Sequence, residues 1–158
     1  MIPDRARLER LFEGAPRFLD RVMAAAPFRD DDDLFATARV IAHAMPEADQ
    51  VELIDAHPRL GAPPGTVSAL SHAEQGYDRP SDATVDVAAE LERLNDAYEA
   101  RFGFRYCVFV AGRPREALLP GMAAALGGSR DAERHRALDA VLDIAIDRHA
   151  KLSAEASR

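Results

Sequence analysis

The sequence predicts an all-α protein, a single compact domain of about seven to eight helices with irregular packing and no significant sheet. Two observations support this prediction. Apolar residues recur at the three- and four-residue spacing of helices in one segment after another, and glycine or proline separates these segments. Only the short run 106–110 is β-branched and aromatic, and a lone strand has nothing to pair with.

Size and composition favour a soluble globular domain that spans residues 1–158. No apolar run approaches the roughly 20 residues that cross a bilayer, and the first residues lack a signal-peptide pattern, so we expect a cytoplasmic protein without a membrane partner. The net charge of −7 argues against a nucleic-acid partner. Cys107 is the only cysteine, which excludes an intramolecular disulfide and agrees with a reducing compartment.

Four helices are expected in the first part of the chain, around residues 8–12, 16–26, 34–45 and 47–56. Gly14 ends the first helix, Pro16 can occupy the first position of the second, and Pro46 separates the third from the fourth. Pro58 disfavours helical geometry at the residue before it, so the fourth helix should end at or just before His57.

The acidic run Asp30–Asp33 has two interpretations. It resembles a cluster of metal ligands, but aspartate at an N-cap and in a first turn also complements the helix dipole. Because an apolar helical stripe follows directly, we favour the capping role.

The second part of the chain predicts further helices around residues 81–102, 114–126 and 131–152, the last with Ile146 on its apolar stripe. Ser71 and Glu74 fit a capping box at the start of a shorter helix after the Gly/Pro-rich loop 61–65. Asn95 falls within an apolar stripe, where a polar group needs a partner, so we expect a buried structural hydrogen bond.

His57 is the first candidate for chemistry. A histidine at a helix C-terminus can simply be favoured by the helix dipole. It can also be poised for proton transfer, because its unperturbed pKa lies near physiological pH. Glu74 and Gln75 offer acceptors and donors side by side, which suits a urea- or amide-like ligand.

Other chemistries have weaker support. The histidines at positions 43, 57, 72, 135 and 149 are scattered and lack metal-ligand spacing. Ser68, Ser71 and Cys107 lack the sequence context of a nucleophile, and a cysteine in an apolar run is usually a small buried hydrophobe.

Five segments occur in order over nearly the whole chain: Ala56-His57-Pro58 followed by Leu60-Gly61, Ser71-x-x-Glu74-Gln75, Leu94-Asn95-x-x-Tyr98, Phe102-Gly103-Phe104-x-Tyr106 and Ile144-Ala145-x-x-Arg148. Together they resemble the OHCU decarboxylase family, which acts on 2-oxo-4-hydroxy-4-carboxy-5-ureidoimidazoline (OHCU) in urate breakdown.

The resemblance implies an all-α homodimer that works without metal or organic cofactor, with His57 as the catalytic proton donor and (S)-allantoin as the product. It also implies a set of substrate-binding residues, some of which act through their backbone: Pro58, Ser71, His72, Ala73, Glu74, Gln75, Tyr106, Cys107, Val108, Phe109, Val110 and Arg148. In this set Arg148 would supply a positive charge.

Two arginines depart from the family pattern: Arg59 stands where aspartate is common, and Arg105 where proline is usual. They add positive charge near the presumed cleft, and two interpretations stay open: the changes are harmless, or the substrate is a related, more negatively charged ureide. The alternatives are a non-catalytic helical ligand-binding or scaffold domain, and a metal-dependent ureide hydrolase that uses His57, His72 and Glu74.

Overall fold

The computed structural model describes residues 1–61, 68–75 and 85–158, and this part of the chain forms eight helices and no strand. The helices are α1 (Arg5–Phe12), α2 (Pro16–Ala24), α3 (Asp31–Ala44), α4 (Glu47–Asp55), α5 (Ala69–Glu74), α6 (Val85–Phe102), α7 (Arg115–Ala125) and α8 (Arg130–Ala156). The prediction of an all-α fold is confirmed.

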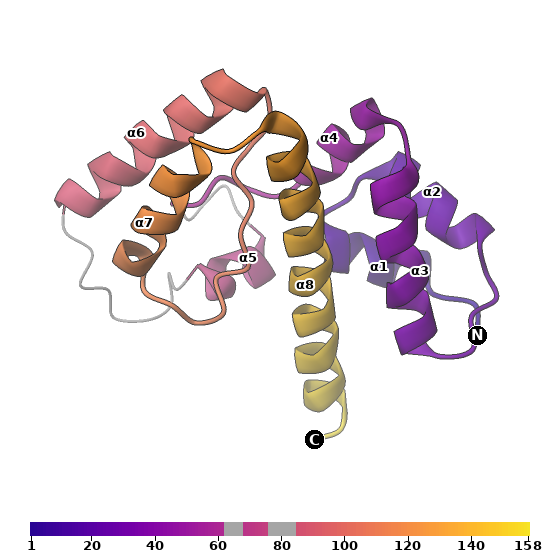
Figure 1. Ribbon diagram of the computed structural model, residues 1–158. Helices are drawn as coiled ribbons and strands as arrows, with labels where there is room; N and C mark the ends of the chain where they lie inside the picture. The colour runs from indigo at the N-terminus through magenta and orange to yellow at the C-terminus, as the bar shows by residue number, and fades with distance from the viewer. Residues whose placement is uncertain (62–67, 76–84) are drawn as a thin grey trace.

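The long helix α8 is the axis of the molecule. In Figure 1 the helices α1–α4 lie on one side of α8, and α5, α6 and α7 lie on the other. α8 packs directly against α1, α3 and α4, while α6 packs against α7. One apolar core joins the two sides, since buried residues of α1, α6 and α8 belong to the same cluster. The pocket described below is lined by residues of α8, of α5, of the chain just after α4 and of the segment after α6.

The acidic run Asp30–Asp33 caps the start of α3, as predicted. The Asp30 carboxylate accepts a hydrogen bond from the Asp33 backbone N–H at 2.8 Å, and Asp31, Asp32 and Asp33 fill the first turn of α3. The aspartates therefore cap a helix, and Pro16 likewise occupies the first turn of α2.

The predicted capping box at residues 71 and 74 is wrong. Ser68 is the N-cap of α5, and its hydroxyl accepts from the Ser71 N–H. Ser71 lies one turn later and is buried, so its hydroxyl and the Glu74 carboxylate are available to tertiary contacts. One expectation for α8 also fails, because Ile146 is 39% exposed. Arg148, on the same helix, is buried.

Residues 105–110 after α6, called the extended segment below, are neither helix nor strand and pair with no strand among the described residues. Gly103 ends α6 with a φ of +80°, a conformation that suits glycine, and its N–H donates to Glu99 O at 2.9 Å. Asn95 makes the predicted buried bond, from Nδ2 to Leu60 O at 2.9 Å. The expected loop 62–65 and the predicted start of the helix near residue 81 lie outside the described residues.

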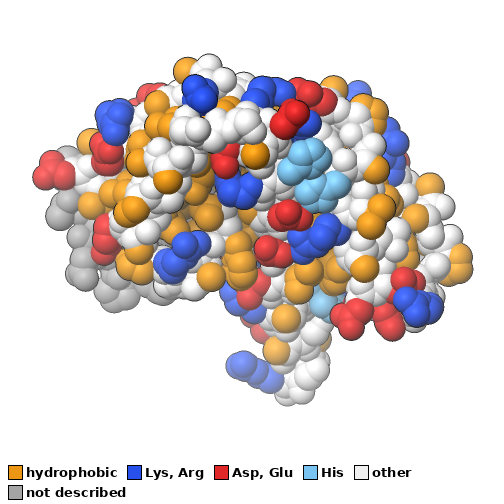
Figure 2. All heavy atoms as spheres, viewed as in Figure 1, with side chains coloured by type: hydrophobic (Ala, Val, Ile, Leu, Met, Phe, Trp, Pro, Cys, Tyr) orange, Lys and Arg blue, Asp and Glu red, His pale blue; other side chains and the backbone are white. Residues whose placement is uncertain are grey.

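No helix in the described part of the chain is long and apolar enough to cross a bilayer. On the face shown in Figure 2, acidic and basic side chains are interspersed. This face therefore carries no basic patch, which agrees with the negative net charge of the sequence.

Candidate active site

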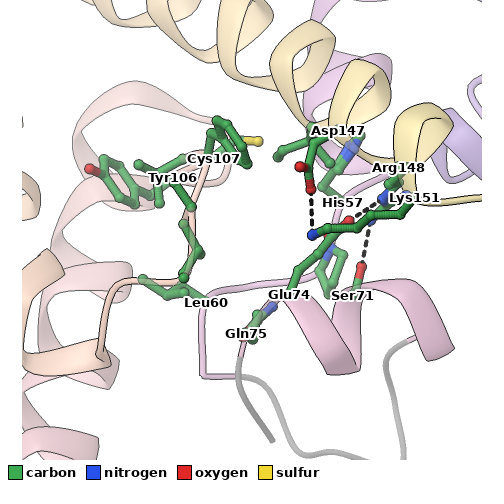
Figure 3. Close-up of a pocket in the computed structure, with 17 residues that line it drawn as sticks. His57, Leu60, Ser71, Glu74, Gln75, Tyr106, Cys107, Asp147, Arg148 and Lys151 are labelled. Carbon is green, nitrogen blue, oxygen red and sulfur yellow. Dashed lines mark hydrogen bonds and ion pairs between the residues drawn. The ribbon is translucent and has the colours of Figure 1, made fainter. Parts of the chain in front are cut away.

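A cavity of about 300 Å³ lies between the end of α4, α5, α8 and the extended segment (Figure 3). It is lined by eleven of the residues that the sequence singled out: His57, Pro58, Ser71, Glu74, Gln75, Tyr106, Cys107, Val108, Phe109, Val110 and Arg148. His72 and Ala73 share α5 with them but do not line the cavity. Sequence reasoning missed six lining residues: Leu60, Ala111, Gly112, Ile144, Asp147 and Lys151.

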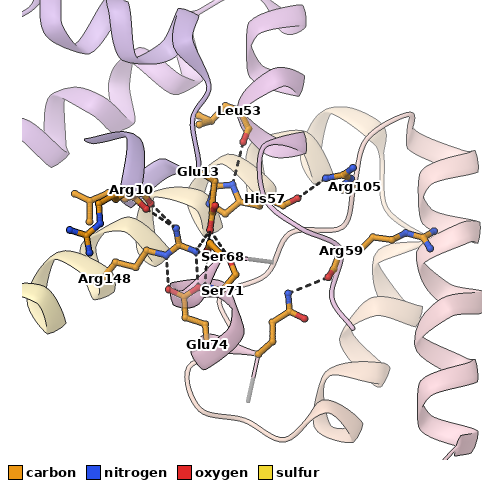
Figure 4. Close-up of polar contacts among 12 residues, drawn as sticks. Arg10, Glu13, Leu53, His57, Arg59, Ser68, Ser71, Glu74, Arg105 and Arg148 are labelled. Carbon is orange, nitrogen blue, oxygen red and sulfur yellow. Dashed lines mark hydrogen bonds and ion pairs between the residues drawn. The ribbon is translucent and has the colours of Figure 1, made fainter. Parts of the chain in front are cut away.

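His57 lies just beyond the end of α4, as predicted. The helix ends at Asp55, and the ring is only 4% exposed. Arg105 fixes this helix end, because its Nη1 donates to Asp55 O at 2.9 Å and to His57 O at 3.0 Å (Figure 4). The Asp55 carbonyl is among those that an α-helix leaves without an intrahelical partner. Arg105 thus holds the histidine backbone in place.

The protonation of His57 follows from its surroundings. Nδ1 lies 3.4 Å from Leu53 O, and since a carbonyl can only accept, Nδ1 carries the proton. Burial, and then the charge of Arg148, lower the pKa of His57 to about 4, while Glu13 and the Leu53 carbonyl act in the opposite direction. The ring is therefore neutral at pH 7. Its Nε2 presents a lone pair and is buried without a hydrogen-bond partner among the described residues.

Arg148 is the centre of a buried polar network (Figure 4). Its Nε donates to Glu74 Oε1 at 2.6 Å, and its Nη2 donates to Glu74 Oε2 at 2.9 Å. Nη1 donates to the carbonyls of Arg10 and Leu11 at the end of α1, both at 3.2 Å. This arginine therefore joins α1, α5 and α8 behind the cavity.

Glu13, which the sequence analysis did not single out, is the second carboxylate of this network. Its Oε1 lies 3.0 Å from Arg148 Nη2 and accepts from the hydroxyls of Ser68 and Ser71. Burial would raise the pKa of Glu13, but the two hydroxyls and then Arg148 lower it overall. Burial would likewise lower the pKa of Arg148, and Glu74 and Glu13 raise it. Glu13 and Arg148 are therefore both charged at pH 7.

Gln75 ties the loop after His57 to α5. Its Oε1 accepts from the Gly61 N–H at 2.7 Å, and its Nε2 donates to Arg59 O at 3.2 Å. The amide thus shapes the wall of the cavity between Leu60 and α5. This contact explains why the sequence places glutamine beside Glu74, which the capping box did not explain.

Two arginines bind backbone carbonyls of the extended segment, residues of which line the cavity. Arg136 Nη1 donates to Cys107 O at 2.9 Å, and Arg113 binds the carbonyls of Phe109 (2.6 Å) and Val110 (2.9 Å). In a trans peptide the C=O and the following N–H point in opposite directions, so these bonds turn the N–H of Val108 away from Arg136. In the described part of the chain, no acceptor satisfies the N–H groups of residues 108–110.

A further carboxylate, that of the buried Glu133, holds Arg136 in place. Glu133 Oε1 accepts from Tyr98 Oη at 2.9 Å and from Arg136 Nε at 3.0 Å. The guanidinium also lies over the Tyr106 ring, 4.9 Å from its centroid. Glu133 and Arg136 fix the extended segment through Tyr98 and Tyr106, and their only sequence signal was a three-residue spacing on one helix.

Arg59 and Arg105 adjoin lining residues in the sequence, but neither of them lines the cavity. Of the two interpretations of these substitutions, the harmless one agrees with their positions. Arg59 makes a fork with Glu99, 3.0 Å for each bond, and a further contact with Asp96. Two carboxylates thus compensate its charge, while Arg105 is engaged with the end of α4. The substitutions anchor the loop and the helix end and leave the charge of the cavity unchanged.

No group of three histidine, cysteine, aspartate or glutamate side chains in the described ranges is arranged to hold a metal ion. Burial raises the pKa of the Cys107 thiol to about 12, so the cysteine is not a ready nucleophile. The chemistry that this geometry supports is proton transfer by a neutral imidazole, beside backbone donors and a fixed carboxylate.

Comparison with known proteins decides the family. The family model described as OHCU decarboxylase matches residues 4–150. The chain belongs to the OHCU decarboxylase family. Of this chain, 85% aligns at 28% identity with 80% of a 2-oxo-4-hydroxy-4-carboxy-5-ureidoimidazoline decarboxylase from Haloferax volcanii.

Two further relatives agree with the family assignment. The uric acid degradation bifunctional protein PucL of Bacillus subtilis is 30% identical over 94% of this chain, which spans 30% of that longer protein. A crystal structure of OHCU decarboxylase in the presence of (S)-allantoin shares the fold, with a TM-score of 0.74 at 21% identity over 92% of this chain and 96% of the other.

Proposed function

We propose that this protein decarboxylates OHCU to (S)-allantoin, with His57 as the residue that moves the proton. The observation that carries the proposal is the Nε2 atom of His57: it is buried at the cavity and has no partner in the described part of the chain. A buried polar atom without a partner is costly in a folded protein, so it indicates a ligand. Family membership supports the choice of substrate.

The substrate itself supplies the electron sink. When the carboxylate leaves as CO₂, its bonding electron pair moves into the neighbouring ring C=N, whose nitrogen takes up one proton. The resulting enol then transfers its hydroxyl proton to the adjacent ring carbon. The hydroxyl carbon becomes a carbonyl, and the adjacent carbon becomes the stereocentre of allantoin. The substrate anion and one proton thus give CO₂ and allantoin.

His57 suits the second step. In the neutral ring Nδ1–H is directed at Leu53 O, so Nε2 can take the hydroxyl proton as a base. The imidazolium then returns this proton to one face of the ring carbon, which makes His57 the proton donor for the stereocentre. Arg148 and burial both favour the neutral ring, so the proton is given up readily.

The other lining groups orient the substrate. The N–H groups of residues 108–110 can donate to the ring carbonyl and to the developing enolate oxygen. Each oxygen of Glu74 can accept two hydrogen bonds, so the fork with Arg148 leaves acceptor capacity for the ureido N–H groups. In this role Arg148 acts through Glu74, because its own N–H groups are directed at protein acceptors.

The decisive experiment follows freshly generated OHCU by circular dichroism. The purified protein should speed the loss of OHCU and give one allantoin enantiomer. His57→Ala should lower the rate by at least about a hundredfold. His135→Ala serves as the matched control, because His135 stacks on His43 and does not line the cavity. Full activity in a correctly folded His57→Ala variant would sink the assignment.

We also propose that residues 1–158 act as one catalytic domain, as a cytoplasmic homodimer that needs neither a metal nor an organic cofactor. The family resemblance supports the dimer, and the delocalising ring of the substrate makes a cofactor unnecessary. Light scattering after gel filtration tests the mass, and activity after dialysis against a chelator tests the metal. A monomer, or activity that returns only with added metal, would contradict these statements.

A further inference from the structure

The charges that line the cavity leave the substrate carboxylate with few partners. Among the described lining residues only Arg148 and Lys151 carry a positive charge, since His57 is neutral at pH 7. A ureide that carries a carboxylate needs a cation or several donors to replace its water. Which of the two cations can serve is decided by the contacts that each already makes.

Arg148 is not available to a ligand. A guanidinium has five N–H groups, and here all of them face protein acceptors. Its charge is also matched within 3.0 Å by two carboxylates, those of Glu74 and Glu13. A carboxylate that approached Arg148 would compete with both.

Lys151 is in a different situation. It lies one turn beyond Asp147 on α8, and its Nζ is 2.6 Å from Asp147 Oδ2. Its side chain is 60% exposed, and Figure 3 shows it reaching from α8 toward Asp147 beside Arg148 and Glu74. It is also the only lysine in the chain, whose other basic residues are all arginine. A long, flexible stem lets an ammonium change partners at little cost.

We infer that Lys151 is a specificity-determining residue, which leaves Asp147 and binds the carboxylate of the incoming ureide at the mouth of the cavity. The inference rests on the proposed function, because OHCU carries a carboxylate and allantoin does not. It also orients the substrate: the carboxylate faces α8 and the solvent, and the ureido arm faces Glu74. CO₂ then leaves at the open side, and Lys151 returns to Asp147.

The contact between Lys151 and the carboxylate should increase the affinity for the substrate and should not accelerate the chemical step. Negative charge moves from the carboxylate to the ring as the C–C bond breaks, so the attraction to Lys151 is greater in the ground state than in the transition state. Removing such a contact raises KM and does not lower kcat. An exposed ion pair is also weakened by salt.

The test compares Lys151→Gln, Lys151→Arg and the matched control Arg93→Gln in steady-state decarboxylation. Arg93 is 63% exposed, pairs with Glu90 on α6 and does not line the cavity, so its loss changes the net charge by the same amount. We expect Lys151→Gln to raise KM about fivefold, with kcat equal to or above that of the parent protein. Lys151→Arg should stay within about twofold, and Arg93→Gln should change neither constant. Added salt should raise KM for the parent protein more than for Lys151→Gln.

An unchanged KM in Lys151→Gln, or a loss confined to kcat, would overturn the inference while leaving the proposed function intact. If the parent protein does not decarboxylate OHCU at all, the proposed function fails, and calorimetry then judges Lys151. The probes are hydantoate, a ureide with a carboxylate, and its neutral amide. Tighter binding of hydantoate that is lost in Lys151→Gln supports the role of Lys151, and equal binding of the two probes rejects it.

Discussion

The guanidinium of Arg148 holds the carboxylate of Glu74 in a two-bond fork, with 2.6 Å from Nε to Oε1 and 2.9 Å from Nη2 to Oε2. The fork connects α8 with α5, two elements on which the cavity depends. Arg148 is 1% exposed and the Glu74 side chain is half-buried, so the bidentate pair is largely shielded from water. This relationship makes Arg148 part of both the stability and the geometry of the cavity.

Arg148→Met should destabilise the protein strongly. The variant leaves the half-buried carboxylates of Glu74 and Glu13 without their cation. Breaking a buried ion pair typically costs about 3–5 kcal/mol, and we expect a cost at the low end of that range. Arg39→Met is the matched control, because Arg39 pairs with Asp139 and Asp143 at the surface. Its loss should cost under about 1 kcal/mol. Urea unfolding measures both free energies, and equal costs would contradict the buried role of Arg148.

Much of this architecture was predictable from the sequence. Helical spacing located α1 to α4 and α8, Asp30 marked the start of α3, and Pro58 marked the end of α4 before His57. These features are local, because they depend on residues within one or two turns of each other. The place of Asn95 within an apolar stripe was likewise enough to predict its buried hydrogen bond.

Contacts between distant segments were not predictable. Glu13 reaches Arg148 across 135 positions of the chain, and nothing around Glu13 marks it as part of a cavity. The fork of Arg148 with Glu74 spans 74 positions, and the local capping motif at Ser71 and Glu74 gave no sign of it. Arg59 looked like added charge near the cleft, because its partners Glu99 and Asp96 come from a different helix.

The free energy of unfolding should decrease as the pH is lowered from about 6.5 to about 4, because of His57. Its pKa is about 4 when folded and about 6.5 when unfolded, so the unfolded state binds more protons between these values. The contribution is complete above pH 6.5 and is lost as the pH falls toward 4. From pH 7 to pH 4.5 the free energy of unfolding of the parent protein should decrease by about 2–3 kcal/mol through His57. His57→Gln should not show this decrease. Urea unfolding at the two pH values measures the difference, and parallel losses in both proteins would contradict it.

The pH dependence of the reaction should show that the neutral imidazole is the starting form. Because the pKa of His57 is about 4, kcat/KM should be level from about pH 5.5 to 8 and fall in more acidic solution. If the free enzyme needed the imidazolium, kcat/KM would decrease about tenfold for each unit by which the pH rises across this range. Stopped-flow assays on freshly generated OHCU separate the two profiles.

Cys107 should be dispensable, because the cavity uses its backbone and not its thiol. Burial raises the pKa of the thiol to about 12, with Arg136 and Arg148 acting in the opposite direction. Cys107→Ala should therefore keep kcat within about threefold, since the Cys107 carbonyl that binds Arg136 is retained. In the parent protein, a thiol reagent should react slowly when folded and rapidly in urea. Fast labelling of the folded protein would contradict the buried thiol.

Arg136 should act as a positioning residue, since it contacts the carbonyl of Cys107 and does not line the cavity. Arg136→Lys keeps a positive charge near Glu133 but loses the fixed fork, so the peptide between residues 107 and 108 can rotate. Losing a directed donor to an oxyanion costs about a hundredfold or more in kcat, and a donor that is only loosened should cost about tenfold.

The matched control for this substitution is Arg101→Lys, because Arg101 also donates to a backbone carbonyl, that of Gly128, away from the cavity. Both variants should be assayed well below their unfolding temperatures, so that stability does not limit the rate. A merely structural role would lower stability and leave kcat of the folded protein unchanged, whereas a positioning role lowers kcat with the pH profile of His57 unaltered. Equal kcat values in the two variants would therefore assign Arg136 to stability alone.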